Sequence, residues 1–158
     1  MAMEADSILV QPPVTDVWAT PKWLFEALDR EFGFSLDPCS DGKNQKCDRH
    51  FTQAENGLLR DWGRETVFMN PPYSEVGDWV RKAYGAALEG ATVVCLVPSR
   101  TDAGWWHDYA MKGEIRFIRG RLRFGDDERR FGGNGGAPFP SAVLIFRPRE
   151  FKLVSANL

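Results

Sequence analysis

The chain has 158 residues, the length of a single domain with a substantial core. Hydrophobic residues make up 43% of the sequence and charged residues 27%, which excludes a disordered chain, a collagen and a coiled coil. No apolar run is long enough for a membrane helix, and a net charge of −2 does not by itself indicate a polyanionic partner. Three cysteines, an odd number, favour a reducing cytoplasm over a disulfide scaffold. We therefore expect a soluble cytoplasmic domain with no membrane partner.

The first predicted elements are an arm and a helix. Residues 1–17 show little periodicity and are interpreted as a loose N-terminal arm. Thr20 followed by Pro21 is a helix-start pair, with Thr20 as the N-cap and Pro21 at the first helical position. Apolar residues then recur at helical spacing up to Gly33, which is placed to end the helix.

The middle of the chain alternates strand and helix patterns. Residues 34–37 predict a short strand, residues 38–65 show no clear pattern, and residues 66–69 predict a buried strand. Ser74 is placed to cap the next helix, and Gly90 is placed to end it.

The remaining elements complete an α/β pattern. Residues 91–97 form a continuous apolar, β-branched run, which is typical of a strand covered on both faces. A helix is expected to begin at Asp102, and residues 114–118 and 141–146 predict further strands. The alternation of strands and helices indicates an α/β fold with an at least partly parallel sheet, in one domain over residues 18–150. Residues 151–158 are then a C-terminal tail.

A proline-rich loop carries the clearest chemical signal. Asn70 is followed by Pro71, Pro72 and Tyr73, directly after the predicted buried strand. A residue before proline avoids the helical conformation and proline has no N–H, so this loop is stiff and extended. It presents the Asn70 side-chain oxygen and a backbone carbonyl as two fixed acceptors beside an aromatic ring. Such a loop suits a planar amine, which offers two donors and a face for stacking.

The same arrangement indicates transfer of a group to that amine. Two acceptors that pull on both N–H bonds favour a nitrogen with a localised lone pair, and these bonds strengthen as positive charge develops. The sulfonium methyl of S-adenosylmethionine is the natural electrophile. Ligands of α/β sheets bind at the carboxyl ends of the strands, where Asp37, Asn70 and Ser99 would lie together. A proline-rich turn that only closes a strand is the alternative interpretation.

At these residues the sequence resembles the amino-methyltransferases, whose signature is Asp, Asn or Ser followed by two prolines and an aromatic residue. More narrowly, it resembles the phage-type DNA N6-adenine methyltransferases of the Dam family. The resemblance runs from residue 18 to about residue 147, through segments 18–25, 37–40, 46–52, 56–58, 68–74, 96–100, 117–121 and 141–146. It implies a minimal class I methyltransferase core, which is a Rossmann-like, doubly wound and mostly parallel sheet without a separate recognition domain. A bacteriophage or prophage origin and a bacterial or phage-infected host cytoplasm are also implied.

The resemblance implies roles for individual residues. The catalytic loop would consist of Asn70, Pro71, Pro72 and Tyr73. Eight residues would bind S-adenosylmethionine: Thr20, Pro21, Asp37, Pro38, Cys39, Ser40, Glu55 and Asn56. The chain departs from the family pattern in two places, because the loop after the first strand lacks a Gly-x-Gly sequence and Asn56 stands where relatives often carry aspartate.

Basic side chains gather in the second part of the chain. Residues 1–65 hold 7 basic and 12 acidic side chains, whereas residues 66–158 hold 13 basic and 10 acidic ones. The arginine fork suits phosphates and base edges, and a glycine-rich loop permits close approach to a phosphate chain. We expect residues 119–140 to contact double-stranded DNA, and a homodimer would add contacts; a solvated surface loop is the alternative. The expected nucleic-acid contacts are Arg100, Arg119, Arg121, Arg123, Arg129, Arg130 and Asn134.

The sequence thus predicts an S-adenosylmethionine-dependent DNA methyltransferase that modifies N6 of a flipped-out adenine. The same signature serves cytosine N4, an RNA base or a glutamine amide, and a catalytically inactive nucleic-acid-binding module of the same fold is a further alternative. No metal is expected, because Cys39, Cys47 and His50 lack a fourth ligand and the tight pairing of a structural zinc site.

Overall fold

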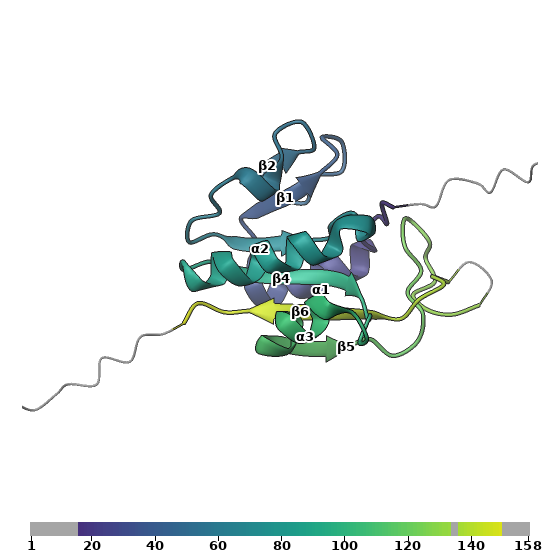
Figure 1. Cartoon of the computed structure of the whole chain (residues 1–158). Coiled ribbons are helices and arrows are strands. Elements are labelled where there is room, and N and C mark those ends of the chain that lie inside the picture. The colour runs from purple at the N-terminus through teal and green to yellow at the C-terminus, as the bar shows by residue number, and fades with distance from the viewer. Residues whose placement is uncertain (1–15, 134–135, 150–158) are drawn as a thin grey trace, which may run out of the picture.

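A six-stranded sheet forms the centre of the protein, in the order β2-β1-β3-β4-β6-β5 (Figure 1). The computed structural model describes residues 16–133 and 136–149. Strands β1 to β4 pair in parallel, whereas β6 is antiparallel to both β4 and β5. This confirms the predicted α/β fold with a partly parallel sheet. The strands are β1 Leu36–Ser40, β2 Arg49–Thr52, β3 Thr66–Met69, β4 Thr92–Pro98, β5 Glu114–Phe117 and β6 Ser141–Phe146.

Helices cover both faces of the sheet (Figure 1). Helix α1, Lys22–Phe32, packs on one face, and α2, Val76–Leu88, packs with α3, Gly104–Asp108, on the other. The chain also forms short 3₁₀ turns, which are η1 Gly57–Leu59, η2 Tyr73–Glu75 and η3 Ala110–Lys112. Within the part of the chain that is described, no helix has the length and hydropathy to cross a membrane.

The two layers of helices explain the apolar central strands. In β4, Val93 and Cys95 belong to the core on the α2 side, whereas Val94 and Leu96 belong to the core on the α1 side. All six residues of β6 are buried. A strand that is covered on both faces has no polar side, so the prediction of a buried strand from the continuous apolar run at residues 91–97 is confirmed.

The start of α1 differs from the prediction. The helix begins at Lys22, Pro21 is its N-cap residue, and no side chain caps it. The Thr20 hydroxyl instead accepts a hydrogen bond from the Asn70 side chain. The predicted N-cap at Thr20 is therefore wrong, because a tertiary partner takes its hydroxyl. Gly33 does end the helix, in the left-handed conformation with a φ of 68°.

Other predictions also need correction. The helix expected to begin at Asp102 begins at Gly104. Ser74 does not cap α2, which begins at Val76 after η2; its backbone N–H and its hydroxyl bind the Asp16 carboxylate instead. The first strand lies two residues later than predicted, at Leu36–Ser40, and the patternless segment 38–65 contains β2 and η1. Because β2 is a short, half-exposed edge strand, it leaves no clear alternation in the sequence.

Candidate active site at the carboxyl edge of the sheet

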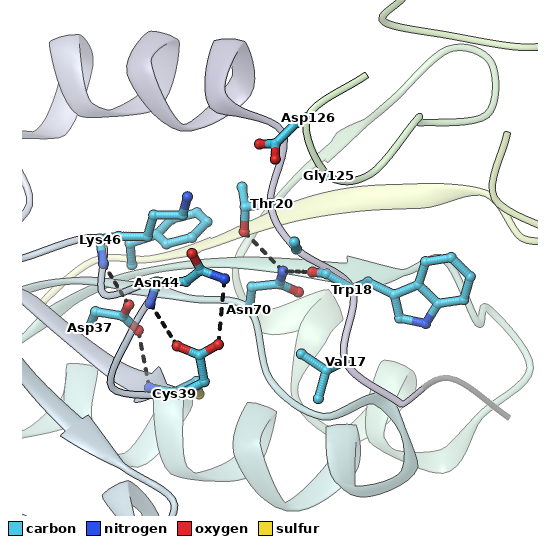
Figure 2. A pocket seen from close by; sticks show the side chains of 13 residues that line it. Val17, Trp18, Thr20, Asp37, Cys39, Asn44, Lys46, Asn70, Gly125 and Asp126 are labelled. Atoms are coloured by element: carbon cyan, nitrogen blue, oxygen red, sulfur yellow. Dashed lines mark hydrogen bonds between the residues drawn. The ribbon is translucent and has the colours of Figure 1, made fainter. Parts of the chain in front are cut away.

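A pocket opens beside the carboxyl ends of β1 and β3 (Figure 2). Four stretches of chain that are far apart in sequence meet there: the segment before α1, the end of β1 with its following loop, the end of β3, and a loop near residue 125. The lining residues are Val17, Trp18, Ala19, Thr20, Asp37, Cys39, Asp41, Asn44, Lys46, Phe68, Asn70, Gly125 and Asp126. Asp37 and Asn70 thus share the edge on which the parallel strands were expected to bring them together, whereas Ser99 does not line the pocket.

The amide of Asn70 is held in one orientation. Its Nδ2 donates to the Trp18 carbonyl and, at 2.9 Å, to Thr20 Oγ1 (Figure 2). Both hydrogens of the amide are therefore in use. Its Oδ1 is buried, and no donor in the described residues bonds to it. A buried acceptor without a partner costs about 1–3 kcal/mol, so this oxygen is suited to a donor supplied by a ligand.

Residues 16–20, which we call the N-terminal strap, hold the loop at residues 70–73 at both ends. At one end, Trp18 and Thr20 bind the Asn70 amide. At the other end, the Tyr73 backbone N–H donates to the Asp16 carbonyl at 3.2 Å, and the Ser74 backbone N–H donates to Asp16 Oδ1 at 2.6 Å. The Ser74 hydroxyl donates to Asp16 Oδ2 at 2.7 Å. The strap thus adds a second constraint to a loop that its prolines already stiffen.

Tyr73 belongs to a cluster of four aromatic rings. Its ring meets the edges of Phe139 and Phe124, with centroids 5.4 and 6.5 Å apart. The Trp18 ring contacts the same two phenylalanines at 5.2 and 5.3 Å. Burial raises the pKa of the Tyr73 hydroxyl far above its usual value, so the hydroxyl stays protonated. Tyr73, Pro71 and Pro72 lie next to the pocket residue Asn70 but do not line the pocket themselves.

Asp37 shapes the loop that follows β1. The Cys39 backbone N–H donates to its Oδ1 at 3.1 Å, and the Lys46 backbone N–H donates to its Oδ2 at 2.9 Å. Burial raises the pKa of this carboxyl group, and the two backbone hydrogen bonds partly oppose that rise. Further along, Asp41 Oδ1 accepts from the backbone N–H groups of Lys43 and Asn44, at 2.8 and 2.6 Å. Carboxylate acceptors therefore organise this loop, which has no Gly-x-Gly sequence.

The charge of the pocket favours a cationic ligand. Its lining holds three acidic residues, Asp37, Asp41 and Asp126, against one basic residue, Lys46. The Asp37 residue is 5% exposed, so solvent screens the charge of its carboxylate weakly. A positively charged group in this pocket would gain favourable interactions that an anion would not.

The structure places the other predicted cofactor residues outside the pocket lining. Ser40 Oγ accepts from the Gly42 backbone N–H at 2.9 Å, and Glu55 Oε1 accepts from the Thr52 backbone N–H at 3.1 Å. Asn56 adopts a φ of 51°, and its side chain accepts from the Leu58 backbone N–H at 3.3 Å. These three side chains stabilise their own turns. Pro21 and Pro38 also lie outside the lining.

Several pocket residues were missed by the sequence analysis. Asp41, Asn44 and Lys46 follow β1, and Asp126 comes from a loop about eighty residues further along the chain. The Asp41-Gly42 pair is a turn signal that marks where the first of these loops bends. No local pattern marks Asp126, because only the tertiary path of its loop brings it to the pocket.

The predicted DNA-contacting arginines fall into two groups. Arg100, Arg119 and Arg121 are exposed, and no hydrogen bond or ion pair ties their side chains to another residue of the described segments. Arg130 lies over the Trp23 ring at 4.8 Å, and Arg129 binds Asp127. Asn134 lies outside the described residues.

Arg123 differs from the other arginines because its side chain is only 4% exposed. Its Nε donates to Asp127 Oδ2 at 2.7 Å, and one terminal nitrogen donates to the Gly132 carbonyl at 2.7 Å. Arg123 thus closes the loop that contains it. Arg119, Arg121 and Arg123 have the alternate spacing of residues on one strand face, but they do not share one, because the consecutive residues Leu122 and Arg123 are both buried. Leu122 and Arg123 lie in an irregular hairpin in which Leu122 pairs with Phe131.

This hairpin is joined to the N-terminal strap. Leu122 forms a bridge with Phe131, and the Arg123 backbone N–H donates to the Arg130 carbonyl at 3.1 Å. At the tip, the Gly125 backbone N–H donates to the Ala19 carbonyl at 2.8 Å. The hairpin and the loop at residues 70–73 therefore bind the same strap from two sides.

The Asp127 ion pairs are expected to make stability depend on acid pH. Hydrogen bonds from Arg129 and then Arg123 hold the pKa of the Asp127 carboxyl well below its usual value of 3.8. Because the folded-state pKa is the lower one, this contribution to the free energy of unfolding is complete above pH 3.8 and is lost as the pH falls through the folded-state value. In urea denaturation, the free energy of unfolding of Asp127→Asn should lie below that of the wild type by a constant amount from pH 7 to about 5. This difference in free energy should become smaller at lower pH. Glu128→Gln, which changes an exposed neighbouring residue, is the control. If the difference in free energy of unfolding between the wild type and Asp127→Asn stayed the same below about pH 3, the lowered pKa of Asp127 would not be its cause.

The cysteines are free thiols, and burial raises the pKa of Cys47 to about 12. Within residues 16–133 and 136–149, no group of three or more His, Cys, Asp or Glu side chains is arranged to hold a metal ion.

Comparison with known proteins gives the family of this chain. The family model described as DNA N-6-adenine-methyltransferase (Dam) matches residues 9–156. A DNA N-6-adenine-methyltransferase of Escherichia phage T1 is 28% identical over 164 residues, which cover 88% of this chain and 65% of that protein. One of Haemophilus phage HP1 (strain HP1c1) is 35% identical over 94 residues, covering 58% of this chain and 54% of that protein.

A third relative, the putative methyltransferase YfdM of Escherichia coli (strain K12), is 39% identical over 67 residues, covering 38% of this chain and 74% of that protein. The chain spans 65% and 54% of the lengths of the two phage relatives. The family model nevertheless covers nearly the whole sequence, including the strap, the Asn70 loop and the arginine-rich hairpin. The chain therefore belongs to the DNA N-6-adenine-methyltransferase (Dam) family.

Proposed function

We propose that this chain transfers a methyl group from S-adenosylmethionine to N6 of an adenine in DNA. The observation that carries this proposal is the Asn70 amide, whose hydrogens are both bonded and whose buried oxygen has no donor among the described residues. An adenine amine supplies the missing donor. The two phage relatives named as DNA N-6-adenine-methyltransferases support the choice of adenine and of DNA.

The pocket residues suit S-adenosylmethionine. This molecule carries a sulfonium and an ammonium against one carboxylate, and its excess positive charge matches a lining with three carboxylates and one lysine. Asp37, Asp41 and Asp126 would hold the cationic groups, and Lys46 would bind the ligand carboxylate. When bound, S-adenosylmethionine supplies an electrophilic methyl group.

The residues of the catalytic loop then act on the target amine. Asn70 Oδ1 and the Pro71 carbonyl each accept one N–H, which draws the nitrogen lone pair out of the ring. The amine nitrogen would form a bond to the methyl carbon as the bond from that carbon to the sulfonium sulfur breaks, with S-adenosylhomocysteine as the leaving group. The nitrogen would then release one proton to solvent, without the need for a strong base. Because Asn70 Oδ1 is buried in this structure, the base reaches it only after neighbouring side chains move. Tyr73 would stack on the flipped base, whose extrusion costs a few kcal/mol.

We also propose that the chain has a Rossmann-like, class I methyltransferase core. A sheet in the order β2-β1-β3-β4-β6-β5, with one reversed strand and helices on both faces, supports a Rossmann-like class I methyltransferase core. The pocket lies at the carboxyl ends of β1 and β3, which is the edge where such sheets bind their ligands.

The exposed arginines of the hairpin region are the proposed DNA contacts. Replacing Arg119 and Arg121 with alanine is expected to weaken DNA binding, and to lower the slope of log affinity against log salt by about 1 for each phosphate that is no longer bound. Affinity for S-adenosylmethionine should not change. A matched control removes two arginines on helix surfaces, Arg30 and Arg81. Equal decreases in both double variants, measured by fluorescence anisotropy at several salt concentrations, would contradict this interface.

The function is tested by methyl transfer to DNA. Purified protein is incubated with labelled S-adenosylmethionine and adenine-unmethylated DNA, and the product nucleosides are separated and identified by mass spectrometry. We expect N6-methyladenine. N4-methylcytosine, or label in RNA or protein in place of DNA, would change the substrate assignment. DNA binding without heat of cofactor binding in calorimetry would indicate an inactive nucleic-acid-binding module instead.

A further inference from the structure

The Asn70 side chain meets two acceptors, and this limits how it can be oriented. An asparagine amide has two orientations, related by a half turn, that exchange its oxygen and its NH2 group. Here Nδ2 donates to the Trp18 carbonyl and to Thr20 Oγ1. In the opposite orientation, Asn70 Oδ1 would face the Trp18 carbonyl oxygen with no hydrogen between them. The Trp18 carbonyl, which can only accept, therefore selects the orientation that leaves Oδ1 free for a ligand, and the Thr20 hydroxyl accepts the second amide hydrogen and holds the side chain there.

Thr20 is held firmly enough to keep the Asn70 amide in this orientation. Its side chain lines the pocket, the residue is 7% exposed, and Pro21 follows it with a φ of −57°. The strap around it is tied on both sides, since Asp16 binds Ser74 and the Ala19 carbonyl accepts from Gly125. A hydroxyl on such a segment has little freedom, so its bond to Asn70 is preorganised.

We propose that Thr20 is a positioning residue for methyl transfer, which acts by holding the Asn70 amide with its oxygen toward the target amine. This inference rests on the proposed function, in which Asn70 Oδ1 accepts an N–H of that amine. The role differs from the cofactor contact that the family resemblance implies for Thr20. Its bond is made to the catalytic side chain, so removing that bond acts on the chemical step.

The hydrogen bond itself is testable without cofactor or DNA. In a ¹⁵N-labelled sample, the Asn70 NH2 signals are identified by their absence from Asn70→Ala. Their exchange with water should be about tenfold slower than that of the exposed Gln53 amide, because Asn70 donates both hydrogens inside the protein. Thr20→Val keeps the shape of the side chain but removes the acceptor, and should speed Asn70 exchange about fivefold or more. Thr20→Ser keeps the hydroxyl and should restore slow exchange.

The kinetic effect should fall on kcat. At saturating S-adenosylmethionine and DNA, Thr20→Val is expected to lower kcat about tenfold, whereas the KM for DNA and the Kd for the cofactor stay within about twofold of the wild type. Thr20→Ser should recover most of the rate. In an Asn70→Ala background, Thr20→Val should change kcat by less than about twofold, because the two residues act through one interaction.

Three outcomes would overturn the inference. An unchanged kcat and unchanged amide exchange in Thr20→Val would show that the bond is not needed. A raised Kd for the cofactor with an unchanged saturated rate would make Thr20 a cofactor contact only. A Thr20→Ser variant as slow as Thr20→Val would show that the hydroxyl is not the active feature. If the wild type methylates no DNA, the proposed function fails, while the exchange measurement still decides whether Thr20 orients Asn70.

Discussion

Replacing Asn70 with alanine is expected to lower the rate of methyl transfer about 100- to 1000-fold, which is the usual effect of removing one preorganised polar group that stabilises developing charge. Asn70 Oδ1 accepts no hydrogen bond in the described structure, so the proposed bond from the target amine is the interaction that this variant removes from it. The rate is measured with labelled S-adenosylmethionine at saturating DNA. Cofactor affinity by calorimetry should change little, because the cationic groups of the ligand are matched by carboxylates elsewhere in the pocket.

The control for this variant is Gln53→Ala, which removes an exposed amide side chain outside the pocket. It should retain the wild-type rate. A second variant, Asn70→Asp, keeps an acceptor oxygen but loses both donors, and it would place a carboxylate oxygen against the Trp18 carbonyl. We expect its rate to fall about tenfold or more. Full activity of Asn70→Ala in a folded protein would rule out the mechanism proposed here.

Replacing Gly57 with alanine is expected to be the most damaging single methyl addition near the site. A Cβ at this position would lie 2.3 Å from the Pro38 carbonyl oxygen and 3.1 Å from the Trp79 ring. Neither neighbour can move away from the added methyl group, because Pro38 belongs to β1 and the Trp79 side chain is packed in the core, where the residue is 6% exposed. Overpacking of this kind costs about 1–3 kcal/mol, which is roughly 2–12 °C in Tm for a chain of this size.

The Gly57→Ala clash also pushes on the residue next to Asp37, so the affinity for S-adenosylmethionine should fall with the stability. Gly85→Ala is the matched control: it lies inside α2, and no atom would come within 4 Å of its Cβ. Alanine there should stabilise the helix by about 0.5–1 kcal/mol. Calorimetric Tm values that fall equally in the two variants would contradict the close approach of Gly57 to β1.

Buried strands are specified by local sequence, whereas the partners of several polar side chains come from distant segments. The strands at residues 66–69 and 141–146 were predicted with the bounds that the structure gives, because a buried strand carries its apolar pattern within itself. Thr20 and Ser74 have the composition of helix caps, yet both bind partners from distant segments instead. A sequence pattern typical of a helix cap shows only that a hydroxyl could bind the nearby backbone. Here each hydroxyl binds a residue from a distant segment instead.

Some residues of the candidate site could be predicted from the sequence, and others could not. Asn70 and Asp37 were placed at one edge from the rule that parallel strands end together, and the pocket confirms that they share it. Asp126 could not be placed, since its position depends on how the hairpin folds back to Ala19. Arg123 resembles its neighbouring arginines in the sequence, but the structure buries it against Asp127.

The sequence by itself determined the α/β architecture and the loop at Asn70, because apolar periodicity and proline stiffness act over a few residues. Only the tertiary structure decided which way the Asn70 amide is turned and which side chains form the pocket. The bonds responsible join Asn70 to Trp18 and to Thr20, and Ser74 to Asp16, across 52, 50 and 58 residues of chain. Hydrogen bonds over such separations leave no periodic trace in a sequence, and they form only once the sheet has brought the two segments together.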